Sequence, residues 1–438
     1  MSRPVVILGA GLAGLSAAYH LKREHVLLEK ESRPGGLVRT ESQNGFHFDY
    51  TGHFLHFRTQ ECKDLVLKKI LKRNQSSHVR RSSIYSHGTM TRYPFQANTL
   101  GLPQSVVQEC LRGLLWARYR HKRKKKYADF LSWIMATSGP GIARHFMVPY
   151  NTKIWTVPPH QMTPEWIGRF VPQPQVDDFL QGALLDEERG MGYNATFHYP
   201  KKGGIEALSR GFAAGIEDLY TQCAVTRVIL RHKLVEVRGE YQIPYSDLVS
   251  TLPLPVLIRL MGDEVPSGVQ QAARRLRWNS VYNINLGLDR EDTGQAHWVY
   301  FPEKQFPFYR VGFPSRINGA GMAPRGKSSL NAEVSVRQGA RVSARVLVGR
   351  VKQGLVWAGL LRRGERLLAE KVLFIPHAYV IYDREHRANV ALIQRFLRTK
   401  GIRSIGRYGS WEYSAMEDAM LAGKRAAGQV DRGEKLSA

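Results

Sequence analysis

Cysteines are few in this sequence, and long apolar runs are missing. Its three cysteines, Cys62, Cys110 and Cys223, are widely spaced in a chain of 438 residues, which excludes a disulfide framework and a cysteine-rich zinc site. No apolar run approaches the roughly 18 residues that a membrane-spanning helix requires. The first residues, MSRPVVILGAG, form a strand pattern at once and contain no secretory signal. We therefore expect a soluble protein of the reducing cytoplasm with no metal site.

Basic residues outnumber acidic ones: the chain has 64 Lys and Arg and 37 Asp and Glu, which gives a formal net charge of +27. Such a surplus favours a polyanionic partner: nucleic acid, anionic lipid or a phosphorylated small molecule. The densest run, RYRHKRKKK from Arg118 to Lys126, is most simply a solvated helix end, and its second interpretation is a peripheral contact with an anionic membrane. Because no zinc-finger, RNA-recognition or basic-zipper pattern accompanies it, we expect no nucleic-acid partner.

The beginning of the chain has the pattern of a dinucleotide-binding turn. A short apolar strand leads into GAGLAG, and a helical apolar pattern follows. In this context Gly9 allows the tight turn, Gly11 lets the backbone approach a pyrophosphate, and Gly14 lets helix and strand pack closely. The helix N-terminus then faces the phosphates. A second strand ends in Glu29, whose carboxylate can bind ribose hydroxyls.

A second glycine-rich segment favours FAD over NAD. Residues 33–40 (RPGGLVRT) resemble the second glycine motif of the flavoprotein group that contains amine oxidases, protoporphyrinogen oxidases, phytoene desaturases and UDP-galactopyranose mutases. In that group a late segment, matched here by GRYG at residues 406–409, closes over the flavin with a helix N-terminus near its pyrimidine ring, where the dipole would stabilise a reduced flavin. The resemblance implies FAD as the cofactor. The implied cofactor-binding residues are Gly9, Gly11, Leu12, Ala13, Gly14, Glu29, Lys30, Gly36, Leu37, Arg39, Gly406, Arg407, Tyr413 and Met416.

Six blocks look like UDP-galactopyranose mutase, more the eukaryotic type than the short bacterial type. Their order and approximate spacing are specific together, although no single block is decisive. The resemblance covers most of the chain, and residues from about 318 to 370 match poorly. The blocks are YPFQAN from Tyr93, PYNTKIW from Pro149, NATF from Asn194, WVYFP from Trp298, PFYR from Pro307 and GRYGSWEY from Gly406.

The resemblance implies a pocket for uracil, because a uracil ring needs aromatic faces and an amide for its polar edge. Taken singly, Phe95, Phe146 and Trp155 are equally typical of core aromatics, and Asn151 of a turn cap. An arginine that the family has before the first block finds no clear counterpart, the nearest matched position being Tyr85. The implied substrate-binding residues are Tyr93, Phe95, Gln96, Phe146, Asn151, Trp155, Trp298 and Tyr300.

A diphosphate needs fixed cations and hydroxyl donors, and the resemblance places Arg310 there with two tyrosines as phenol donors. The family's second arginine corresponds to Arg169 displaced by one position, which redirects a side chain on a helix or strand. His53 ends the segment TGH, where the family has a redox-responsive Gly-Gly-His loop. The implied catalytic residues are His53, Arg169, Asn194, Arg310, Tyr379 and Tyr413.

The implied activity is that of a nucleotide-sugar mutase, which interconverts pyranose and furanose forms of UDP-galactose or a related nucleotide sugar. The reaction would use covalent catalysis by N5 of reduced FAD, so NAD(P)H or another reductant would have to charge the flavin. The alternative is an FAD-dependent oxidoreductase of the amine oxidase, protoporphyrinogen oxidase or desaturase type, which shares the FAD motifs and predicts a largely apolar cavity. A nucleic-acid-binding protein with a vestigial flavin fold is the third hypothesis.

The predicted fold class is α/β, with a discontinuous Rossmann-type FAD-binding domain, a helical domain and an antiparallel-sheet substrate domain. Apolar spacing predicts helices at residues 102–118 and 127–147, and alternation predicts strands at residues 224–230 and 282–288. The predicted domain ranges are 1–80, 196–250 and 401–438 for FAD binding, 81–195 for the helical nucleotide-sugar domain, and 251–400 for the substrate sheet.

Overall fold

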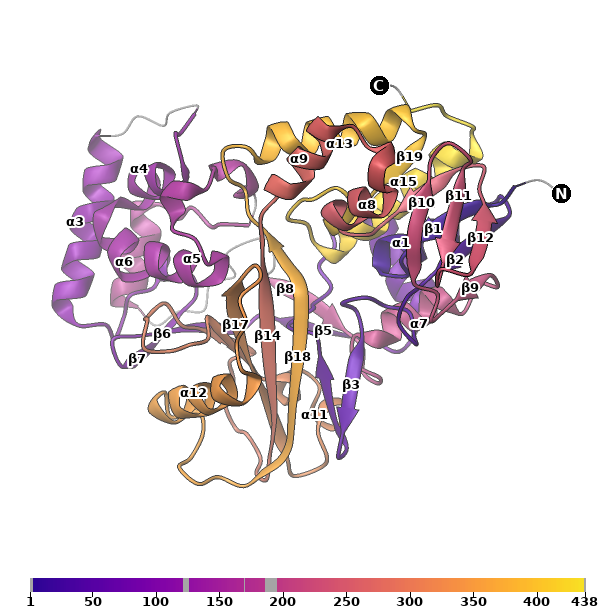
Figure 1. Cartoon of the computed structure of the whole chain (residues 1–438). Coiled ribbons are helices and arrows are strands. Elements are labelled where there is room, and N and C mark those ends of the chain that lie inside the picture. Colours follow the sequence, from indigo (N-terminus) through magenta and orange to yellow (C-terminus); the bar gives the residue numbers. More distant parts are fainter. Residues whose placement is uncertain (1–2, 121–125, 169, 186–194, 437–438) are drawn as a thin grey trace.

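The computed structural model describes residues 3–120, 126–168, 170–185 and 195–436. Figure 1 shows a parallel sheet with helices on one side of the molecule, a sheet of long strands below the middle, and a helical layer on the other side. The arrangement confirms the predicted α/β class. In these segments no helix combines the length and the apolar character needed to cross a bilayer.

Separate stretches of the chain build the parallel sheet, whose strand order is β19-β13-β1-β2-β9. Val6 and Leu8 of β1 join the core under the antiparallel layer β10-β11-β12, whereas Val5 and Ile7 join the core under α1 and α15. A strand covered on both faces needs the continuous apolar run VVIL. The elements are β1 (Val5–Leu8), α1 (Leu12–His20), β2 (His25–Leu28), α7 (Glu206–Ala213), β9 (Leu219–Tyr220), β10 (Val225–Ile229), β11 (Leu234–Val237), β12 (Tyr241–Pro244), β13 (Leu248–Ser250), β19 (Ile402–Ser404), α14 (Gly406–Gly409) and α15 (Met416–Asp431).

Helices α1 and α15 come from opposite ends of the chain and pack directly on each other. A Cβ on Gly423 of α15 would lie 2.4 Å from the Ala13 carbonyl oxygen, so this approach requires glycine. Ser16 Oγ donates a hydrogen bond to the Met420 carbonyl at 2.6 Å. The last helix therefore closes the unit that the first helix begins, as the predicted discontinuity requires.

The second sheet has the strand order β18-β14-β17-β16-β15-β6-β7 and is antiparallel except between β15 and β6. Ile284 and Leu286 of β14 pack under α12, and the asparagines that alternate with them, Asn283 and Asn285, face the opposite side of the sheet. Strands β6 and β7 fall in the range predicted to be helical, yet they form the edge of this sheet. The elements are β6 (Ser82–Ser86), β7 (Thr89–Arg92), β14 (Trp278–Leu288), β15 (Trp298–Tyr300), β16 (Arg310–Gly312), α10 (Pro314–Ile317), α11 (Gly319–Met322), β17 (Ser328–Arg337), α12 (Ala344–Trp357) and β18 (Leu367–Val380).

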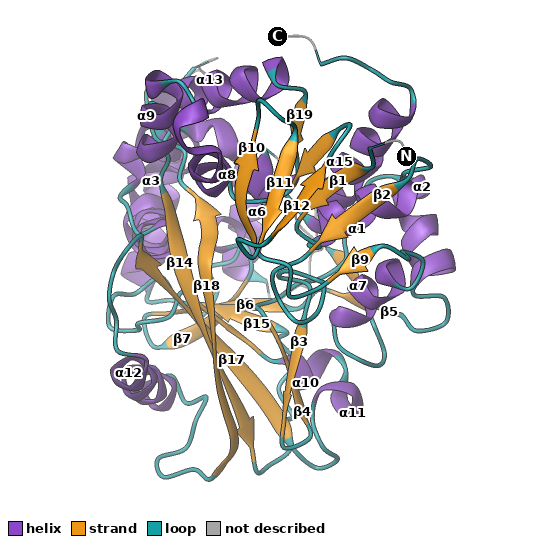
Figure 2. Cartoon of the chain, turned by 45° about the vertical axis from the view of Figure 1, so that its right-hand side comes forward, coloured by secondary structure: helices purple, strands orange, loops and turns teal. Residues whose placement is uncertain are grey.

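Two smaller strand pairs form separate two-stranded sheets. Figure 2 shows α12 on one side of the long strands and the hairpin of β3 (Thr40–Gln43) and β4 (Phe46–Asp49) on the other. A Cβ on Gly287 of β14 would lie 2.8 Å from the Phe46 ring, which shows how closely the hairpin packs on the sheet. The second pair joins β5 (Ser76–Val79) to β8 (Thr196–Tyr199).

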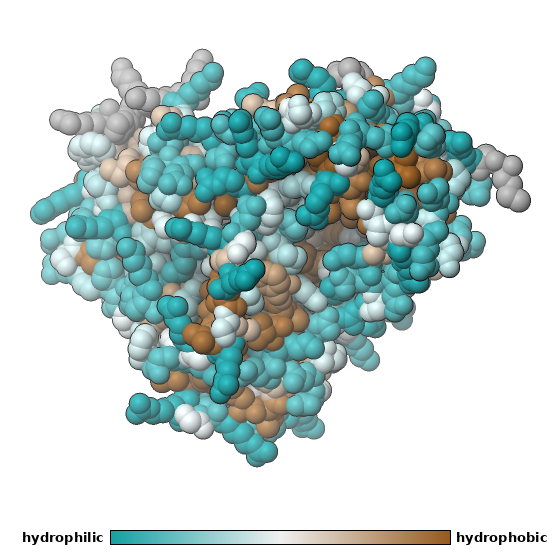
Figure 3. Space-filling view, in the orientation of Figure 1, coloured by the Kyte–Doolittle hydropathy of each residue, from teal (hydrophilic) through white to brown (hydrophobic). Residues whose placement is uncertain are grey.

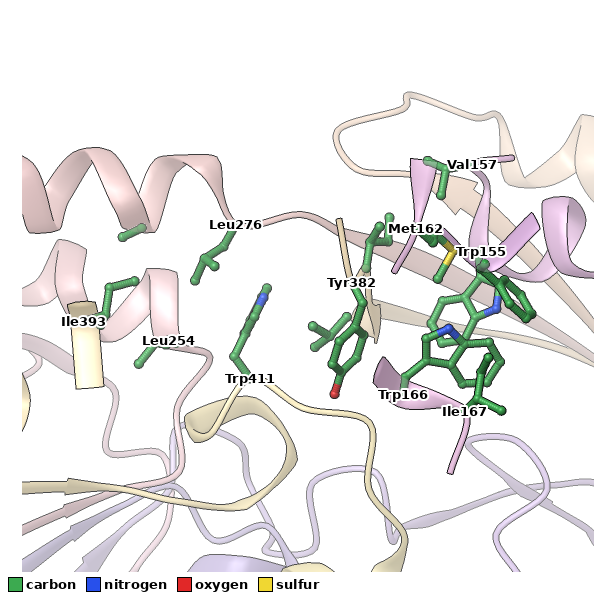
Figure 4. Packing of buried hydrophobic residues seen from close by; sticks show 14 of the residues in the cluster. Trp155, Val157, Met162, Trp166, Ile167, Leu254, Leu276, Tyr382, Ile393 and Trp411 are labelled. Carbon is green, nitrogen blue, oxygen red and sulfur yellow. The ribbon is translucent and has the colours of Figure 1, made fainter. Parts of the chain in front are cut away.

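The helical layer and the parallel-sheet region share one core. Figure 4 shows Trp155 and Trp166 of the helical layer on one side of Tyr382, and Trp411 and Leu254 on the other side. Tyr382 follows β18 and so couples the two regions through the long sheet. The helices of these regions are α2 (Gln60–Asp64), α3 (Gln104–Arg120), α4 (Phe130–Ile142), α5 (Val148–Trp155), α6 (Val176–Leu184), α8 (Leu254–Met261), α9 (Ser267–Arg275) and α13 (His386–Thr399).

Candidate active site

The turn between β1 and α1 has the geometry of a dinucleotide cradle. Gly9 has a φ of +91°, a left-handed conformation that favours glycine. A Cβ on Gly14 would lie 2.0 Å from the Gly9 carbonyl oxygen, whereas a Cβ on Gly11 would meet no atom within 4 Å. The first contact joins helix to strand, and the open space at Gly11 is where a pyrophosphate approaches the backbone in this fold. The glycines therefore fit FAD.

Glu29 and Arg39 border this cradle. The Glu29 carboxylate is 6% exposed and accepts hydrogen bonds from the amides of Ala10 at 2.8 Å and Glu31 at 3.0 Å. Arg39 Nε donates to the Gly36 carbonyl at 3.0 Å within the second glycine segment, and the Gly35 amide donates to the Ala10 carbonyl at 2.8 Å, which holds this segment beside the first. Lys30 has an exposed side chain and pairs with Glu31, so the structure does not hold it at the cradle.

The late segment reaches the cradle as predicted. Gly406 has a φ of +75°, and a Cβ there would lie 2.7 Å from the Cβ of Ala13. Leu12 and Ala13 are buried beneath it, and Met416 begins α15. Gly406, at the start of α14, therefore lies next to the turn between β1 and α1.

A small, partly open cavity lies between the segment after β4 and the long sheet. Asp49, Gly52 and Trp298 form part of its wall. Trp298 stacks on Phe54 with 5.0 Å between ring centres, and its Nε1 is a buried donor with no partner within the described part of the chain. Buried donors are normally satisfied, so this one is available to a bound group.

His53 is half-buried and lies between Gly52 and Phe54, two residues of the cavity wall. Burial and the nearby charges of Arg407 and Arg310 lower the pKa of His53 to about 4. The imidazole is therefore neutral at neutral pH, and the field at this point of the site is positive.

Arg310 is also half-buried, but its charge is offset. Its Nε and one terminal nitrogen each donate to the Glu333 carboxylate at 2.9 Å across strands β16 and β17. Burial opposes the charge, but Glu333 outweighs burial and raises the pKa of Arg310. Tyr309 donates its hydroxyl to the same carboxylate and lies 3.3 Å from the Tyr379 hydroxyl. The sequence alone does not predict Glu333 as the partner of Arg310, because this contact depends on the pairing of β16 with β17.

Arg407 lies against the two predicted phenol donors. The centre of its guanidinium is 4.9 Å from the Tyr413 ring centre and 5.4 Å from the Tyr379 ring centre. It donates to the carbonyls of Ser414 at 2.8 Å and Ala378 at 3.2 Å, while its buried Nε has no partner in the described segments. Within those same segments it forms no salt bridge, so the charge of this half-buried guanidinium has no carboxylate in contact with it.

The predicted uracil residues form one buried aromatic cluster. Phe146 stacks between Phe95 and Tyr150, with ring centres 5.1 Å and 5.2 Å away. Trp155 Nε1 donates to Asn151 at 3.3 Å. Gln96 Oε1 is buried and has no hydrogen-bond partner among residues of known position. Tyr93 and Tyr300 face each other with 5.3 Å between ring centres and extend this cluster toward the sheet.

Arg80 is a site residue that sequence reasoning missed. Its guanidinium lies 4.5 Å from the Tyr93 ring centre, and the residue is 8% exposed. Tyr85, the position matched to the family's early arginine, packs instead on Phe301 at the edge of the long sheet. The available signal was the Arg80-Arg81 pair directly before strand β6. The predicted residues Arg169 and Asn194, and residues 121–125 of the basic run, lie outside the described residues.

The family model for flavin containing amine oxidoreductases matches residues 12–330, and this chain belongs to that family. It is a flavin-dependent enzyme, and its cofactor is FAD. A crystal structure of reduced UDP-galactopyranose mutase is similar to it over 98% of this chain and 94% of that chain, with 27% sequence identity and a TM-score of 0.91. That likeness extends over both sheets and the helical layer.

Two further relatives are oxidases. A candidate protoporphyrinogen oxidase from Exiguobacterium sp. 255-15 has a TM-score of 0.76 and 17% identity, covers 99% of this chain and 100% of that chain, and shows a shared fold. Coproporphyrinogen III oxidase from Staphylococcus aureus (strain NCTC 8325 / PS 47) is 27% identical over 117 residues. The matched region spans 24% of this chain and 24% of that enzyme.

Proposed function

We propose that this protein is an FAD-dependent nucleotide-sugar mutase that interconverts the pyranose and furanose forms of UDP-galactose or a related sugar. The observation that carries the proposal is the half-buried charge of Arg407, which forms no salt bridge within the described residues and lies beside Tyr379 and Tyr413. A diphosphate is an anion that would balance this charge and accept from both phenols. The alkylammonium substrate of an amine oxidase would be repelled by the same charge, which already lowers the pKa of His53.

The aromatic cluster supplies the other half of a nucleotide site. Gln96 Oε1, without a partner in the described structure, is an acceptor for the N–H of a uracil ring. Phe146 is covered on both faces by Phe95 and Tyr150, so it supports the aromatic wall and does not itself stack on the base. Tyr93 and Tyr300 face each other, and Tyr300 pairs with Arg310 across β15 and β16, so we expect both tyrosines to lie beside the sugar of a bound nucleotide sugar.

FAD, when bound and reduced, supplies a nucleophilic nitrogen, so the interconversion involves no net redox change. The chain's own residues orient the sugar and stabilise the departing diphosphate. Arg407 and the phenols of Tyr379 and Tyr413 are hydrogen-bond donors for the phosphates, and Glu333 fixes the guanidinium of Arg310 in the plane of the carboxylate. Neutral His53 neither adds to the positive charge nor needs to lose a proton first.

The test is turnover without oxygen. The purified holoprotein is reduced with dithionite, mixed separately with UDP-galactopyranose and UDP-galactofuranose, and the products are separated by chromatography; the oxidised protein is the control. We expect interconversion by the reduced protein only. We also expect UDP to change the flavin spectrum. The Kd for UDP should be roughly 10- to 100-fold higher in Arg407→Met, because this variant loses one or two charged hydrogen bonds to the diphosphate.

The matched variant Arg407→Lys retains the charge and should bind UDP more tightly than Arg407→Met. Absence of both turnover and UDP binding would refute the proposal. Oxidation of coproporphyrinogen or an amine under air, with flavin reduction by that substrate, would then assign the oxidoreductase activity of the other relatives. UDP binding without turnover of either galactose form would assign a different sugar within the same class.

A further inference from the structure

The segment from Arg337 to Lys371 has an unusual surface. It contains nine lysines and arginines but only two glutamates, and it begins after residue 330, where the match to the family model ends. Both glutamates are already paired, Glu365 with Arg290 and Glu370 with Lys352. The remaining positive charge of this segment therefore faces solvent without local compensation.

Helix α12 lies at the centre of this segment and on the outside of the long sheet (Figure 1). Its inner face packs on the sheet through Leu347, Val351 and Leu355. Its outer face has Val346, Arg350, Gln353 and Trp357 in one stripe along the helix. Val346 is 61% exposed and Trp357 is 58% exposed, although both are apolar side chains.

Exposed arginines flank this stripe at both ends of the helix. Six of them form no salt bridge with any residue whose position is described: Arg337, Arg341, Arg345, Arg350, Arg362 and Arg363. Arg366 makes only a 3.8 Å contact with Asp289. Structural arginines of a solvated face are usually interspersed with acids, and this face has none free.

The apolar character continues from α12 onto the sheet. Figure 3 shows hydrophobic side chains over β14 and β18 between hydrophilic ones. Phe374 of β18 is 46% exposed and lies 4.7 Å from the Tyr282 ring centre. The Tyr282 hydroxyl reaches the Val342 carbonyl, directly before α12, at 3.5 Å. Val346, Trp357 and Phe374 therefore belong to one surface with the unpaired arginines.

We propose that this surface, defined by α12, its flanking arginines and Phe374, docks the enzyme on an anionic phospholipid bilayer. An outward helix face with arginines and a tryptophan suits the interface, where the guanidinium groups contact lipid phosphates and the apolar side chains enter the headgroup region. A nucleic acid would use the arginines and would leave Val346 exposed to water. The docking is peripheral, and it does not depend on which reaction the site catalyses.

The test is co-sedimentation of the holoprotein with vesicles of phosphatidylcholine alone or of phosphatidylcholine mixed with about 30% of the anionic lipid phosphatidylglycerol. We expect binding only to the anionic vesicles, with a bound fraction that falls as salt is raised. Arg345→Glu with Arg350→Glu should weaken binding by at least about tenfold, because each lost cation is replaced by a repelled anion. Trp357→Ser with Val346→Ser should weaken it by about threefold or more.

The matched control is Arg274→Glu with Arg395→Glu, which changes the net charge equally at exposed helix positions elsewhere. Equal loss of binding in this control would overturn the proposal, because binding would then follow net charge alone. Equal binding to both vesicle types, or none, would overturn it too. Tight binding of a DNA oligonucleotide, lost only in the α12 variant while vesicles bind no protein, would instead assign the surface to nucleic acid. Flavin content and Tm establish that each variant is folded.

Discussion

At the residue scale, Gly11 and Gly14 of the cradle have different roles, and single substitutions can distinguish these roles. A Cβ at Gly14 would overlap the Gly9 carbonyl, whereas one at Gly11 meets only open space. We expect Gly11→Ala to leave the free energy of unfolding of the apoprotein within about 0.5 kcal/mol and to abolish flavin binding. Gly14→Ala should lower both the unfolding free energy and the flavin content. Absorbance of the purified protein and denaturant unfolding measure these quantities, and full flavin content in Gly11→Ala would contradict the assignment.

Asp49 is a second residue with a testable property. It accepts hydrogen bonds from Thr40 Oγ1 at 2.6 Å and the Tyr199 hydroxyl at 2.5 Å, and burial raises its pKa from 3.8 to about 6. The folded protein thus holds this proton more tightly than the unfolded chain, so stability from this group is present below pH 4 and is lost as the pH rises through 6.

The comparison with Asp49→Asn isolates this effect. From pH 4 to pH 7, the unfolding free energy of the wild type should fall relative to that of Asp49→Asn by up to about 3 kcal/mol, the equivalent of this pKa change. Urea unfolding at several pH values measures the difference. A difference that stays constant over this range would show that Asp49 titrates as it does in water.

At the scale of elements, Lys153 joins helix α5 to the connection between β15 and β16. Its buried ammonium donates to three carbonyls, those of Phe301 at 2.7 Å, Glu303 at 2.5 Å and Phe308 at 3.1 Å. This contact holds the helix of the aromatic cluster against the strands that present Tyr300 and Arg310. Lys153→Met should therefore lower the free energy of unfolding by about 3 kcal/mol, since buried acceptors lose their donor.

The matched control is Lys304→Met on the same connection, whose side chain is exposed. Its effect should stay within about 0.5 kcal/mol. Thermal and denaturant unfolding compare the two variants. Equal stability of both proteins would mean that the three carbonyls are satisfied by water once Lys153 is removed.

At the scale of the whole molecule, the last helix anchors the segment that follows His53. Glu417 of α15 is 1% exposed and accepts from the amides of Arg58 at 3.0 Å and Thr59 at 2.9 Å. Burial raises its pKa, but these hydrogen bonds outweigh burial and leave the pKa lowered. The stability from this group is therefore present at neutral pH and is lost as the pH falls through its folded-state pKa.

Glu417→Ala should cost about 3–5 kcal/mol at neutral pH, the range for breaking a buried charged contact, and should weaken flavin retention. Hydrogen exchange should show lower protection of the Arg58 and Thr59 amides, and Tm should fall. Glu434→Ala, at an exposed position of the same terminal segment, should change neither. Unchanged protection at residues 58 and 59 in Glu417→Ala would refute the anchoring role.

Whole-molecule contacts also explain which site residues the sequence could not reveal. Glu333 meets Arg310 through the pairing of β16 with β17, and Arg80 meets Tyr93 because β6 joins a sheet otherwise made of later strands. Arg407 was matched to the flavin from its glycine segment, and only the fold shows it between two tyrosine rings. Strands β6 and β7 form a local hairpin, but its place in the long sheet depends on the pairing of β6 with the distant strand β15.

Short stretches of sequence are enough to predict the cofactor turn, the α/β class and the discontinuity of the FAD-binding unit. These features depend on local backbone geometry, on the spacing of apolar residues within single strands and helices, and on glycines at tight turns. All of them can be recognised from residues that are close together in the sequence. The tertiary structure decided which charges are balanced: Arg310 is paired, Arg407 is not, and the arginines around α12 face solvent. Charge balance in a folded chain depends on burial and long-range pairing, which no short stretch of sequence contains.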